Sequence, residues 1–587
     1  SLGTSAVMTK LNYVIVGSTT AYVKPGGSPV WPYSTWATAA TNIQTAVNAV
    51  FAPGTVYVTN GTYDVYSILS VDKPLTVVGV NGASNTTIKA MPASGYNTQI
   101  LSLNHANAVV EGFRMKGCNL SVPYNGAVRV INGTLRNCML ADNTGWIPSA
   151  VYITGGLVAD CVFTNNGSMG DSRSSGGGVR IDGGVVSNCL FTGNKGAGRG
   201  GAVYMTGGKV VRCIITNNTS GLGGGGVYMM GGGQLINCLV ARNRMTDPLS
   251  IEGGGIGMTA GSVVDCTVAD NIAASGNTGA GLYRTGGTVT NSIFYYNSPA
   301  YPAMGQENIY STGGSIVYSC AQPGPAGAGN ISQTPDFAGR VNGDYRLSFG
   351  SACIDSGTNI PGLVSDLAGN PRPVDGDGNG STIFDMGCYE RSAPGATFEC
   401  NFSAQPTLGT NALQTVFTAV VAGPGTDTVT YVWDFTNDAS SDLVGPQYRV
   451  VTNLYDEPGS YSVKLTCTNS LGTSAVMTKL NYVIVGSTIA HVKPGGTPVW
   501  PYSTWATAAT NIQAAINAVS TPGTVYVTNG TYDVYSMLNV GKVATVIGVN
   551  GASNTTLRAM PGTGYNTQVF SLNHVNAVVE GFRIKGC

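Results

Sequence analysis

The segment GGLVADCVFTNN (residues 155–166) is followed along the chain by two variants of itself, GGVVSNCLFTGN (183–194) and GGKVVRCIITNN (207–218). All three share the pattern Gly-Gly-x-[Val/Leu]-x-x-Cys-x-Φ-x-x-Asn, in which Φ is apolar. From residue 130 to residue 297 the Cys position of this pattern returns every 23–28 residues. Such a period is typical of solenoid proteins, in which each repeat forms one coil that stacks on the next.

Three columns of residues emerge when the repeats are aligned. Identical side chains in such columns stack at the spacing of neighbouring strands, ~4.8 Å. Stacked Asn amides can donate to one neighbour and accept from the other, and the glycines permit left-handed turns. The Cys column is Cys138, Cys161, Cys189, Cys213, Cys238 and Cys266, continued by Ser292; the apolar column is Leu140, Phe163, Phe191, Ile215, Val240, Val268 and Phe294; the Asn column is Asn143, Asn166, Asn194, Asn218, Asn243, Asn271 and Asn297.

The coil sequence resembles that of right-handed parallel β-helix proteins of the pectate-lyase-like superfold. This resemblance implies an all-β fold in which residues 17–392 form a parallel β-helix. The segment PYSTWATAATNIQTAVNAV (32–50) predicts one helix that caps the N-terminal end of the stack. Its apolar residues follow helical spacing, at Trp36, Ala39, Ala40, Ile43, Val47 and Val50. A fold of this kind does not identify chemistry.

Residues 393–486 contain several short strand-like runs separated by turns, which favours an Ig-like β-sandwich. The stretches TYVWDFTND (430–438) and LYDEPGSYSVKLTCTNSLG (454–472) resemble the PKD family. The Gly-Asp-Gly that usually follows Trp-Asp-Phe in that family is replaced by Thr436-Asn437-Asp438. The resemblance implies an extracellular spacer or binding module rather than an enzyme.

A longer repeat relates the two ends of the chain. Residues 1–118 align with residues 470–587 with 21 differences in 118 positions, most of them conservative, such as Val47/Ile516 and Lys89/Arg558. This drift indicates two diverged natural copies, so we expect the chain to be a window on tandem units of 469 residues. The alternative is one duplicated boundary segment in a finite protein. The expected domains are the last strand of a preceding PKD-like domain (1–16), a β-helix (17–392), a PKD-like sandwich (393–486) and the start of the next β-helix (487–587).

The composition excludes several partners. The 587 residues include 29 Lys and Arg against 29 Asp and Glu, and charged residues make up only 10% of the chain. No basic stripe suggests a nucleic acid, and no basic amphipathic segment suggests a membrane surface. No apolar run approaches the ~20 residues that a membrane-spanning helix needs. The 83 glycines and the low charge suit many short strands and tight turns.

The segment DGDGNGSTIFD (375–385) is the one candidate ion site in the sequence. Asp375, Asp377 and Asn379 have the D-x-D-x-N-G spacing of a calcium loop, and Asp385 lies late in the segment. Met386 stands where such a loop usually has Glu. Ca²⁺ is therefore the only candidate cofactor, and an acidic turn without an ion is the alternative.

The 13 cysteines predict mainly buried thiols. No C-x-x-C motif occurs and the Cys column follows the coil spacing, which favours stacked small thiols over zinc. The segment 344–390 resembles the terminal region of many secreted bacterial β-helix proteins, in which Ala is usual at the positions of Cys353 and Cys388. These two departures to the same residue imply a disulfide. Cys400 and Cys467 fall in sandwich strands and are the second candidate pair. Disulfides agree with an exported protein.

One outward-facing column carries aromatic residues and almost no acid: Tyr152, Arg180, Tyr204, Tyr228, Gly257 and Tyr283. Such tyrosines can stack on sugar rings, pack against a neighbouring molecule, or simply stack on one another. Polysaccharide lyases of this fold usually need clustered acids for Ca²⁺ and an Arg or Lys base on one outer face. Asp182 and Arg180 share one coil, but no convergent pair recurs on adjacent coils. The sequence therefore predicts no catalytic residue and no enzyme.

Three functions remain open at this point. The first is structural, with each unit forming part of an extracellular filament or surface stalk whose partners are copies of itself, joined head to tail. The second is a glycan-binding surface adhesin that uses Tyr152, Tyr204, Tyr228 and Tyr283, with a polysaccharide as partner. The third is a polysaccharide lyase or hydrolase. All three place the protein outside the cell or on its surface.

Overall fold

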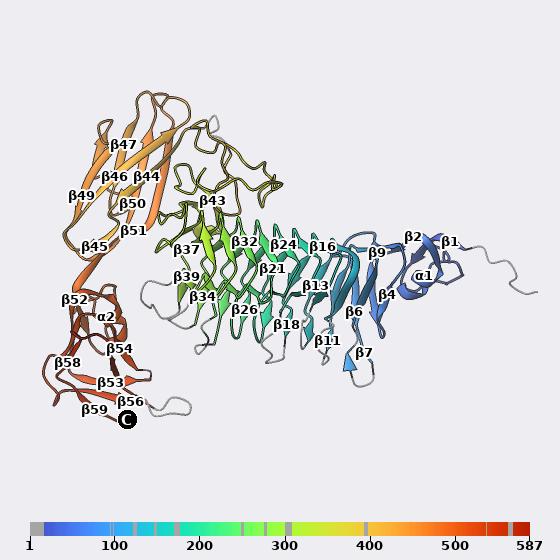
Figure 1. The fold of residues 1–587 in the computed structure, drawn as a ribbon, viewed down its shortest axis with the longest axis horizontal. Coiled ribbons are helices and arrows are strands. Elements are labelled where there is room, and N and C mark those ends of the chain that lie inside the picture. The colour runs from blue at the N-terminus through green and yellow to red at the C-terminus, as the bar shows by residue number, and fades with distance from the viewer. Residues whose placement is uncertain are drawn as a thin grey trace, which may run out of the picture. The chain divides into compact units, whose positions relative to one another are not determined.

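The computed structural model describes residues 17–93, 96–97, 99–120, 126–145, 150–168, 176–247, 250, 252–274, 279–299, 308–392, 397–535, 537–560 and 568–586 (Figure 1). The chain divides into two compact units, the first comprising Ser1–Leu347 and Ser351–Ala393 and the second Ser348–Gly350 and Pro394–Cys587. Residues 1–16 lie outside the described residues, so the strand expected there stays a prediction.

The first unit is a parallel β-helix in which each coil contributes one strand to each of four stacks. The coil around residue 160 shows the pattern: β15 (Val151–Ile153), β16 (Leu157–Ala159), β17 (Val162–Thr164) and β18 (Gly167–Ser168) follow one another along the chain. Each of them pairs in parallel with the matching strand of the next coil, so that Val151 lies opposite Val179 and Phe163 opposite Phe191. The predicted all-β solenoid is thereby confirmed.

The stacks extend over most of the first unit. The first stack continues with β19 (Val179–Ile181), β23 (Val203–Met205), β27 (Val227–Met229), β31 (Ile256–Met258), β35 (Leu282–Arg284) and β39 (Ile309–Ser311), and the second with β20 (Val185–Ser187), β24 (Lys209–Val211), β28 (Gln234–Ile236), β32 (Ser262–Val264), β36 (Thr288–Thr290) and β40 (Ser315–Val317). The third contains β3 (Gly61–Val65), β6 (Thr86–Ala90), β10 (Arg114–Lys116), β13 (Met139–Ala141), β17, β21 (Leu190–Thr192), β25 (Ile214–Thr216), β29 (Leu239–Ala241), β33 (Thr267–Ala269), β37 (Ile293–Tyr295) and β41 (Cys320–Ala321). The fourth contains β11 (Asn119–Leu120), β14 (Thr144–Gly145), β18, β22 (Lys195–Gly196), β26 (Thr219–Ser220), β30 (Arg244–Met245), β34 (Ile272–Ala273) and β38 (Ser298–Pro299).

In the first coils, the first and second stacks share long strands. Residues 128–130 of β12 (Val128–Arg136) pair with β15, whereas residues 134–136 pair with β16. The preceding strands are β1 (Ser18–Val23), β2 (Val50–Val58), β4 (Leu69–Val71), β5 (Leu75–Gly79) and β9 (Leu101–Glu111), and β7 (Pro92–Ala93) and β8 (Tyr96–Asn97) form a small hairpin. The stacks are therefore continuous from the N-terminal coils onward.

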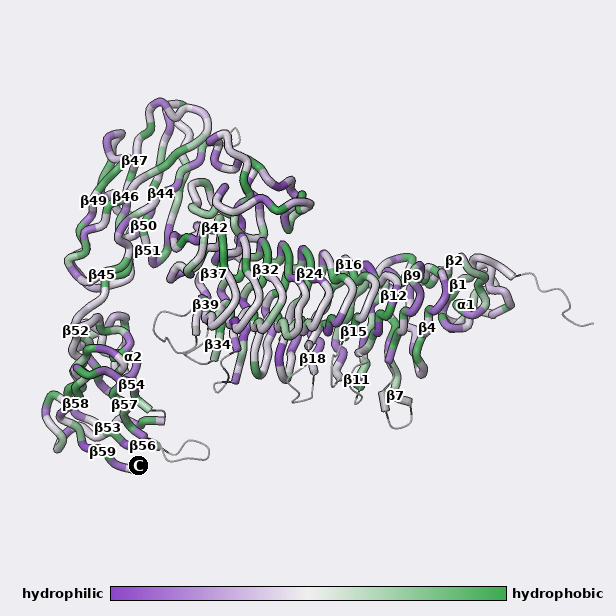
Figure 2. Tube along the Cα trace, in the orientation of Figure 1, coloured by the Kyte–Doolittle hydropathy of each residue, from purple (hydrophilic) through white to green (hydrophobic). Residues whose placement is uncertain are grey.

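The interior of the β-helix is a set of apolar columns. Hydrophobic residues recur at matching places in successive coils (Figure 2). Phe163 and Phe191 stack with ring centroids 4.5 Å apart and planes 8° from parallel. The Val, Ile and Met residues at the ends of the first-stack strands are fully buried, as are the central residues of the second stack. Because each side chain rests on its equivalent in the next coil, one continuous core runs along the whole stack.

Two corners of each coil adopt the left-handed backbone conformation, which Asn, Asp and Gly tolerate best. At the first corner, the residue before the Cys column has φ near +50° in successive coils: Asn137, Asp160, Asn188, Arg212, Asn237, Asp265 and Asn291. At the second corner, the residue before the Asn column has φ of +54° to +68°: Asp142, Asn165, Gly193, Asn217, Arg242, Asp270 and Tyr296. These corners explain why Asn and Asp precede both columns.

The Asn column is a hydrogen-bonded ladder buried at the second corner. The amide nitrogen of Asn218 donates to the side-chain oxygen of Asn243 in the next coil, at 3.0 Å, and to the backbone carbonyl of Phe191 in the preceding coil, also at 3.0 Å. Its own oxygen accepts from the backbone and side-chain nitrogens of Asn194, both at 3.0 Å. The same bonds recur from Asn143 to Asn297. The predicted stacking of amides is confirmed.

The Cys column plays a comparable part at the first corner. Each thiol donates to the backbone carbonyl two residues earlier, for example Cys161 to Ala159 at 3.1 Å and Cys189 to Ser187 at 3.1 Å. Ser292 continues the column with an equivalent bond from its hydroxyl to Thr290 at 2.8 Å. The six column cysteines are buried and free. They are small buried donors that close a corner, as the sequence predicts.

The N-terminal helix is shorter than predicted. It is α1 (Ile43–Ala49), and Asn42 caps it by accepting a hydrogen bond from the backbone of Thr45 at 3.1 Å. Ile43, Ala46 and Val47 face the core, but Trp36 lies before the helix and is 39% exposed. Helical spacing from residue 36 onward was therefore misleading, because the Asn cap sets the start of the helix.

The second unit begins with a two-sheet sandwich. One sheet contains β44 (Glu399–Gln405), β46 (Leu413–Ala422) and β49 (Val450–Tyr455), and the other contains β48 (Leu443–Gly445), β47 (Thr430–Asp434), β50 (Gly459–Thr468) and β51 (Ser474–Val492), with β45 (Leu408–Thr410) alongside β51. Trp433 is completely buried and contacts Phe402, Phe417 and Phe435. This is the sandwich that the sequence predicts.

Strand β51 does not end with the sandwich. Its first part pairs antiparallel with β50, and residues 487–492 pair in parallel with β52 (Val519–Val527) of the second β-helix copy. That copy repeats the first coils with α2 (Ile512–Ala518), β53 (Gly530–Val534), β54 (Leu538–Val540), β55 (Ala544–Gly548), β56 (Thr555–Ala559), β57 (Phe570–Leu572), β58 (Val578–Glu580) and β59 (Arg583–Lys585). The boundary predicted at residue 486 therefore falls inside one strand.

Replacing Asn218 by Ala should destabilise the β-helix by at least about 2 kcal/mol, because it removes the side-chain partner of the buried Asn194 backbone N–H and of the Phe191 carbonyl, and each such group costs about 1–3 kcal/mol. The measurement is urea unfolding, with hydrogen exchange of the peptides around residues 190–245 reporting on the affected coils. Asn107→Ala is the control, since Asn107 is exposed. Equal midpoints for the two variants would contradict a stabilising role for the ladder.

Candidate functional site

An acidic cluster lies in the segment that follows the last coil. After β42 (Phe337–Gly339), the short helix η1 (Arg340–Asn342) and β43 (Asp344–Leu347), residues 351–392 run without regular strands; we call them the strap. Carboxylate oxygens of Asp355, Asp375 and Asp377 lie within 4.8 Å of one another. Asp375 and Asp377 are two of the four predicted ligands, and Asp355 was not predicted.

The loop around Asp375 folds back on its own carboxylates. Asp375 accepts backbone N–H bonds from Gly378 at 2.7 Å and Gly380 at 2.8 Å. Asp355 accepts from the backbone of Gly376 at 3.0 Å and Asp377 at 3.2 Å through one oxygen, while its other oxygen is buried without a hydrogen bond. Burial, and the nearby Asp377 and Asp375 carboxylates, raise the pKa of Asp355 to about 6. A divalent cation would relieve this repulsion.

The other two predicted ligands take different places. Asn379 lies in the same loop, where its side chain donates to Asp377 at 2.8 Å and accepts from Ser381. Asp385 is fully buried and accepts backbone N–H bonds from Asp355 at 2.8 Å and Arg391 at 2.6 Å. Burial first, then the Glu390 carboxylate, raise its pKa to about 8. The assignment of Asp385 as a calcium ligand is therefore wrong; it anchors the strap.

A buried ionic cluster attaches the strap to the β-helix. Arg372 is 4% exposed; its guanidinium donates hydrogen bonds to Glu390 at 2.6 Å and Asn237 at 2.9 Å and lies 3.3 Å from the Asp265 carboxylate, an ion pair without a hydrogen bond. Asn237 and Asp265 are first-corner residues of neighbouring coils. The next coil joins in, since Asn291 donates to the carbonyl of Thr358 at 2.7 Å and accepts from its N–H at 2.8 Å. The strap thus follows the first corner from coil to coil.

The predicted disulfide between Cys353 and Cys388 is wrong. Both are free thiols, and they lie in different clusters. Cys353 packs beside Cys320 of the last coil, whereas the backbone of Cys388 donates to the Thr267 hydroxyl at 3.1 Å. The strap passes over the third stack between these two points, which holds the two thiols in separate surroundings. Cys353 and Cys388, which both stand where Ala is usual, therefore occupy two separate buried sites and do not form a disulfide.

Cys400 and Cys467 do lie together inside the sandwich, as predicted, but as free thiols. The Cys467 thiol hydrogen-bonds Cys400, and this contact raises the pKa of Cys467 and lowers that of Cys400. The structure therefore has the predicted contact without the predicted disulfide.

The tyrosine column is largely covered. Tyr152, Tyr204, Tyr228 and Tyr283 occupy the outward centres of β15, β23, β27 and β35, in register as predicted. However, Tyr204 and Tyr228 are only 1% and 2% exposed. Arg199 lies 4.7 Å from the centre of the Tyr228 ring and pairs with Glu252, and the Tyr204 hydroxyl donates to Met230. Of the three possibilities that the sequence left open, mutual stacking is present, since the rings of Tyr204 and Tyr228 stack with centroids 5.9 Å apart.

The uncovered end of the column holds an ion pair. Arg180 pairs with Asp182 at 3.1 Å, and Asp182 also accepts hydrogen bonds from Tyr152 at 2.8 Å and Thr206 at 2.7 Å. Burial disfavours the charged Asp182 carboxylate, but its bonds from Thr206, Tyr152 and Arg180 prevail and lower its pKa. A carboxylate held ionised by three partners is a poor proton acceptor.

Comparison with known proteins supports the sandwich and adds one short match. Residues 399–482 match the PKD domain family, and residues 188–206, within two coils, match the Chlamydia polymorphic membrane protein repeat. No curated protein matches the chain. Among the described residues, no helix is long and apolar enough to cross a membrane.

Three solved structures are similar to this chain at low sequence identity. Pectate lyase Pel9A is 13% identical with a TM-score of 0.41, over 64% of this chain and 98% of that one. The alginate lyase AlyGC of family PL6 is 11% identical with a TM-score of 0.26, over 92% and 70%. ORF18 of Geobacillus virus E2 is 13% identical with a TM-score of 0.33, over 74% and 82%.

Ca²⁺ at about millimolar concentration, the range of extracellular calcium modules, should stabilise the strap, and Asp355→Asn should remove that effect. The reason is that Asp355 supplies the one buried carboxylate oxygen of the cluster that has no hydrogen bond. Calorimetric titration and the thermal midpoint with and without Ca²⁺ measure it. Asp142→Asn, at an exposed carboxylate paired with Arg114, is the control. Undiminished Ca²⁺ binding by Asp355→Asn would contradict the site.

The β-helix should lose stability as the pH rises from about 4 toward 7. Burial raises the pKa of Asp265 to about 7, whereas an unfolded Asp titrates near 3.9. Within this window Asp265 holds a proton in the folded state that it has lost in the unfolded state, so this residue alone lowers the free energy of unfolding by about 1.4 kcal/mol per pH unit, and the raised pKa values of Asp385 and Asp355 act in the same direction. Asp265→Asn should flatten this slope, because Asn occupies the same corner at Asn237 and Asn291.

The control for Asp265 is Asp160→Asn, since Asp160 occupies the same corner with the same backbone conformation but is exposed. It should keep the slope of the unsubstituted protein. Urea unfolding at four pH values measures both variants. Parallel pH profiles for Asp265→Asn and the unsubstituted protein would contradict the assignment.

Proposed function

We propose that this chain is a structural unit of an extracellular filament or surface stalk, in which β-helix and PKD-like domains alternate in tandem. The PKD match and the polymorphic membrane protein repeat support a place on the cell surface or outside the cell. The near-identity of residues 1–118 with residues 470–587 supports the tandem arrangement. The proposed partners are further copies of the same unit.

Strand β51 carries this proposal. It hydrogen-bonds with sandwich strand β50 up to Val485 and with β52 of the second β-helix copy from Ser487. Strand β45 pairs with residues 484–486, so the junction itself is also bonded. A spacer joined to the next domain by a continuous strand transmits force through backbone hydrogen bonds, whereas a Gly/Ser linker would not.

The β-helix itself suits an extended load-bearing role. Its coils are linked by backbone hydrogen bonds and by the Asn ladder, both of which connect one coil to the next. In a solenoid each coil contacts only the coil before it and the coil after it, so its stability depends on those two neighbours. Such a stack lengthens by adding coils without any change in the packing inside each one.

Two other functions are weaker. For a glycan-binding adhesin, the aromatic column offers Tyr152 at one end and Tyr283 with Tyr310, which stacks on it, at the other, all partly exposed. For a polysaccharide lyase, the acid that shares this face, Asp182, is held by Arg180, Tyr152 and Thr206. We therefore propose a non-catalytic protein.

Incubation of the protein with pectin and alginate in the presence of Ca²⁺ tests for lyase activity. Cleavage of either polymer would overturn that part of the proposal.

Imaging tests the filament. Negative-stain microscopy of source material, labelled with antibody raised against this chain, should show fibres decorated at a regular axial interval, because identical units recur along each fibre. A matched antibody against an unrelated secreted protein of the same source gives the background. Label confined to isolated globular particles would contradict the proposal.

A further inference from the structure

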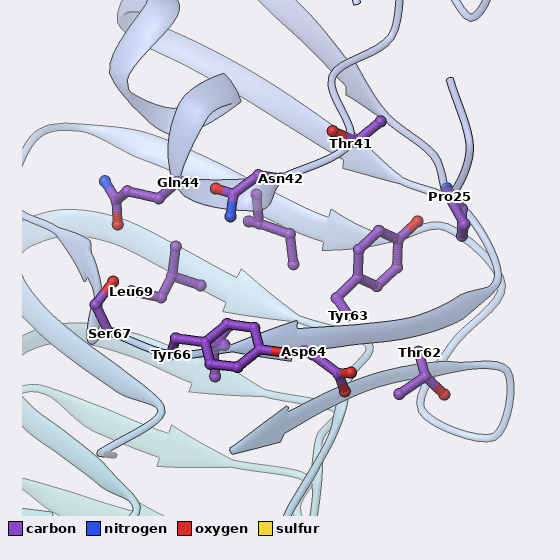
Figure 3. A pocket seen from close by; sticks show the side chains of 12 residues that line it. Pro25, Thr41, Asn42, Gln44, Thr62, Tyr63, Asp64, Tyr66, Ser67 and Leu69 are labelled. Atoms are coloured by element: carbon purple, nitrogen blue, oxygen red, sulfur yellow. The ribbon is translucent and has the colours of Figure 1, made fainter. Parts of the chain in front are cut away.

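A polar pocket lies between α1 and β3, near the N-terminal end of the β-helix (Figure 3). Its volume is about 150 Å³. Thr41, Asn42 and Gln44 line it from the helix side, and Thr62, Asp64 and Tyr66 line it from β3 and the turn that follows (Figure 3). The proposed filament makes no use of this pocket, and it lies away from the strap.

Two of its residues hold the local structure. The Gln44 side chain accepts from the backbone of Ser70 at 2.7 Å and donates to Asn48 at 2.8 Å. The Tyr63 hydroxyl donates to the carbonyl of Thr59 at 3.1 Å. These bonds fix the floor and one wall, so the pocket is formed before any ligand arrives.

The rim carries groups that face solvent. Tyr66 is 62% exposed, which is unusual for a large aromatic side chain on a strand end. The Asp64 carboxylate is exposed and makes no hydrogen bond or ion pair with any residue that the structure describes. The side-chain oxygen of Asn42 caps α1, which leaves its amide N–H groups to donate elsewhere. An aromatic face, an acceptor and a donor therefore share one rim.

The sequence of the second β-helix copy repeats the residues that line this pocket. All 12 lining residues recur 469 positions later, from Pro494 to Leu538, although the copies differ at 21 of 118 positions. The interleaved positions Ile68 and Ser70 have changed, to Met537 and Asn539. The supporting bonds recur too: Gln513 accepts from Asn539 at 2.7 Å, and Tyr535 is 68% exposed.

We propose that each of these two pockets binds one neutral pyranose ring, the terminal sugar of a glycan, so that the chain carries two equivalent sites. The sugar's apolar face stacks on Tyr66, the Asp64 carboxylate accepts its hydroxyl hydrogens, and the Asn42 amide donates to a hydroxyl oxygen. In the second copy Tyr535 and Asn511 take the same parts, and Asp533, which accepts from Arg558 at 2.7 Å and 2.9 Å, offers its remaining lone pairs.

Other ligand classes fit less well. The lining contains no Lys, Arg or His, and Asp64 repels anions, so a uronate or phosphate is disfavoured. A single carboxylate is too few ligands for Ca²⁺. The volume lies below the roughly 300–1,000 Å³ of pockets for drug-sized molecules, which fits one ring rather than a buried oligosaccharide.

Ligand-observed saturation-transfer NMR on the full chain tests the proposal. The probes are the methyl glycosides of glucose, galactose and mannose and free N-acetylglucosamine, with galacturonate as the anionic counterpart. At least one neutral probe should bind with a Kd of about 1–10 mM, since one aromatic face and a few exposed hydrogen bonds must offset the ligand's lost freedom. Galacturonate should bind more weakly.

Variants locate the binding. Tyr66→Ala and Tyr535→Ala should each remove about half of the signal and together abolish it, and Asp64→Asn with Asp533→Asn should weaken binding at least fivefold. Tyr283→Ala and Asp72→Asn are the matched controls, outside the pockets, and should bind normally; circular dichroism confirms that all variants fold. Failure of every neutral probe to bind, or full binding by the double tyrosine variant, would overturn the proposal. Loss of binding in Tyr283→Ala alone would move the site to the tyrosine column and overturn it as well.

Discussion

The rest of this structure depends on the register in which successive coils pair. From Cys138 to Asn297, the Asn column always lies five positions after the Cys column or its Ser292, while the next Cys-column residue follows each Asn by 18 to 23 positions. The corner-to-corner segment is fixed because a shift by one residue would turn buried side chains outward and break the ladder. Most length variation therefore lies in the part of each coil that precedes its first-stack strand; an extra residue in the turn 230–233, between β27 and β28, is an exception. Arg199 and Glu252, which lie beside Tyr228, come from such parts of two coils.

The same register explains how an irregular strap can be held so firmly. The first corners present a row of left-handed Asn and Asp residues at regular intervals, and the strap takes its partners from this row: Asn237, Asp265 and Asn291. A buried Arg372 gains little net stability from its ion pairs, because desolvation offsets most of the attraction. Arg372 instead fixes the position of the strap on the β-helix, because any other placement would bury its charge without an acidic partner. The acidic cluster at Asp355 depends on this placement, because Asp355 and Asp375 are brought together only by the strap's path.

Sequence reasoning succeeded where a feature is local or repeated. The Cys, Asn and apolar columns, the sandwich and the two copies could all be recognised because the same residues recur at intervals that strands impose. Sequence reasoning failed for contacts between residues that are far apart in the sequence and that no repeat relates. Asp355 precedes the acidic loop by twenty residues with no periodic signal, and Cys353 and Cys388 share a sequence context but reach different sites. The burial of Tyr228 depends on the Arg199–Glu252 pair, which links insertions from two different coils.

The differences between the two copies show how such a core tolerates change. Leu75 is replaced by Ala544, which removes volume from the interior, and Val47 by Ile516, which restores part of it in the same cluster. Ile88 and Leu557 occupy the centres of β6 and β56, which are equivalent strands of the two copies, and both are fully buried. Such compensating changes in side-chain volume are tolerated because each apolar column spans several coils, so side chains of neighbouring coils can repack around a smaller residue. In the pocket near Tyr66, Asn42 and Gln44 are retained in both copies with structural roles, since Asn42 caps α1 and Gln44 accepts from Ser70. Asp64 and Tyr66 contribute little to packing, and ligand binding supplies a reason for their retention.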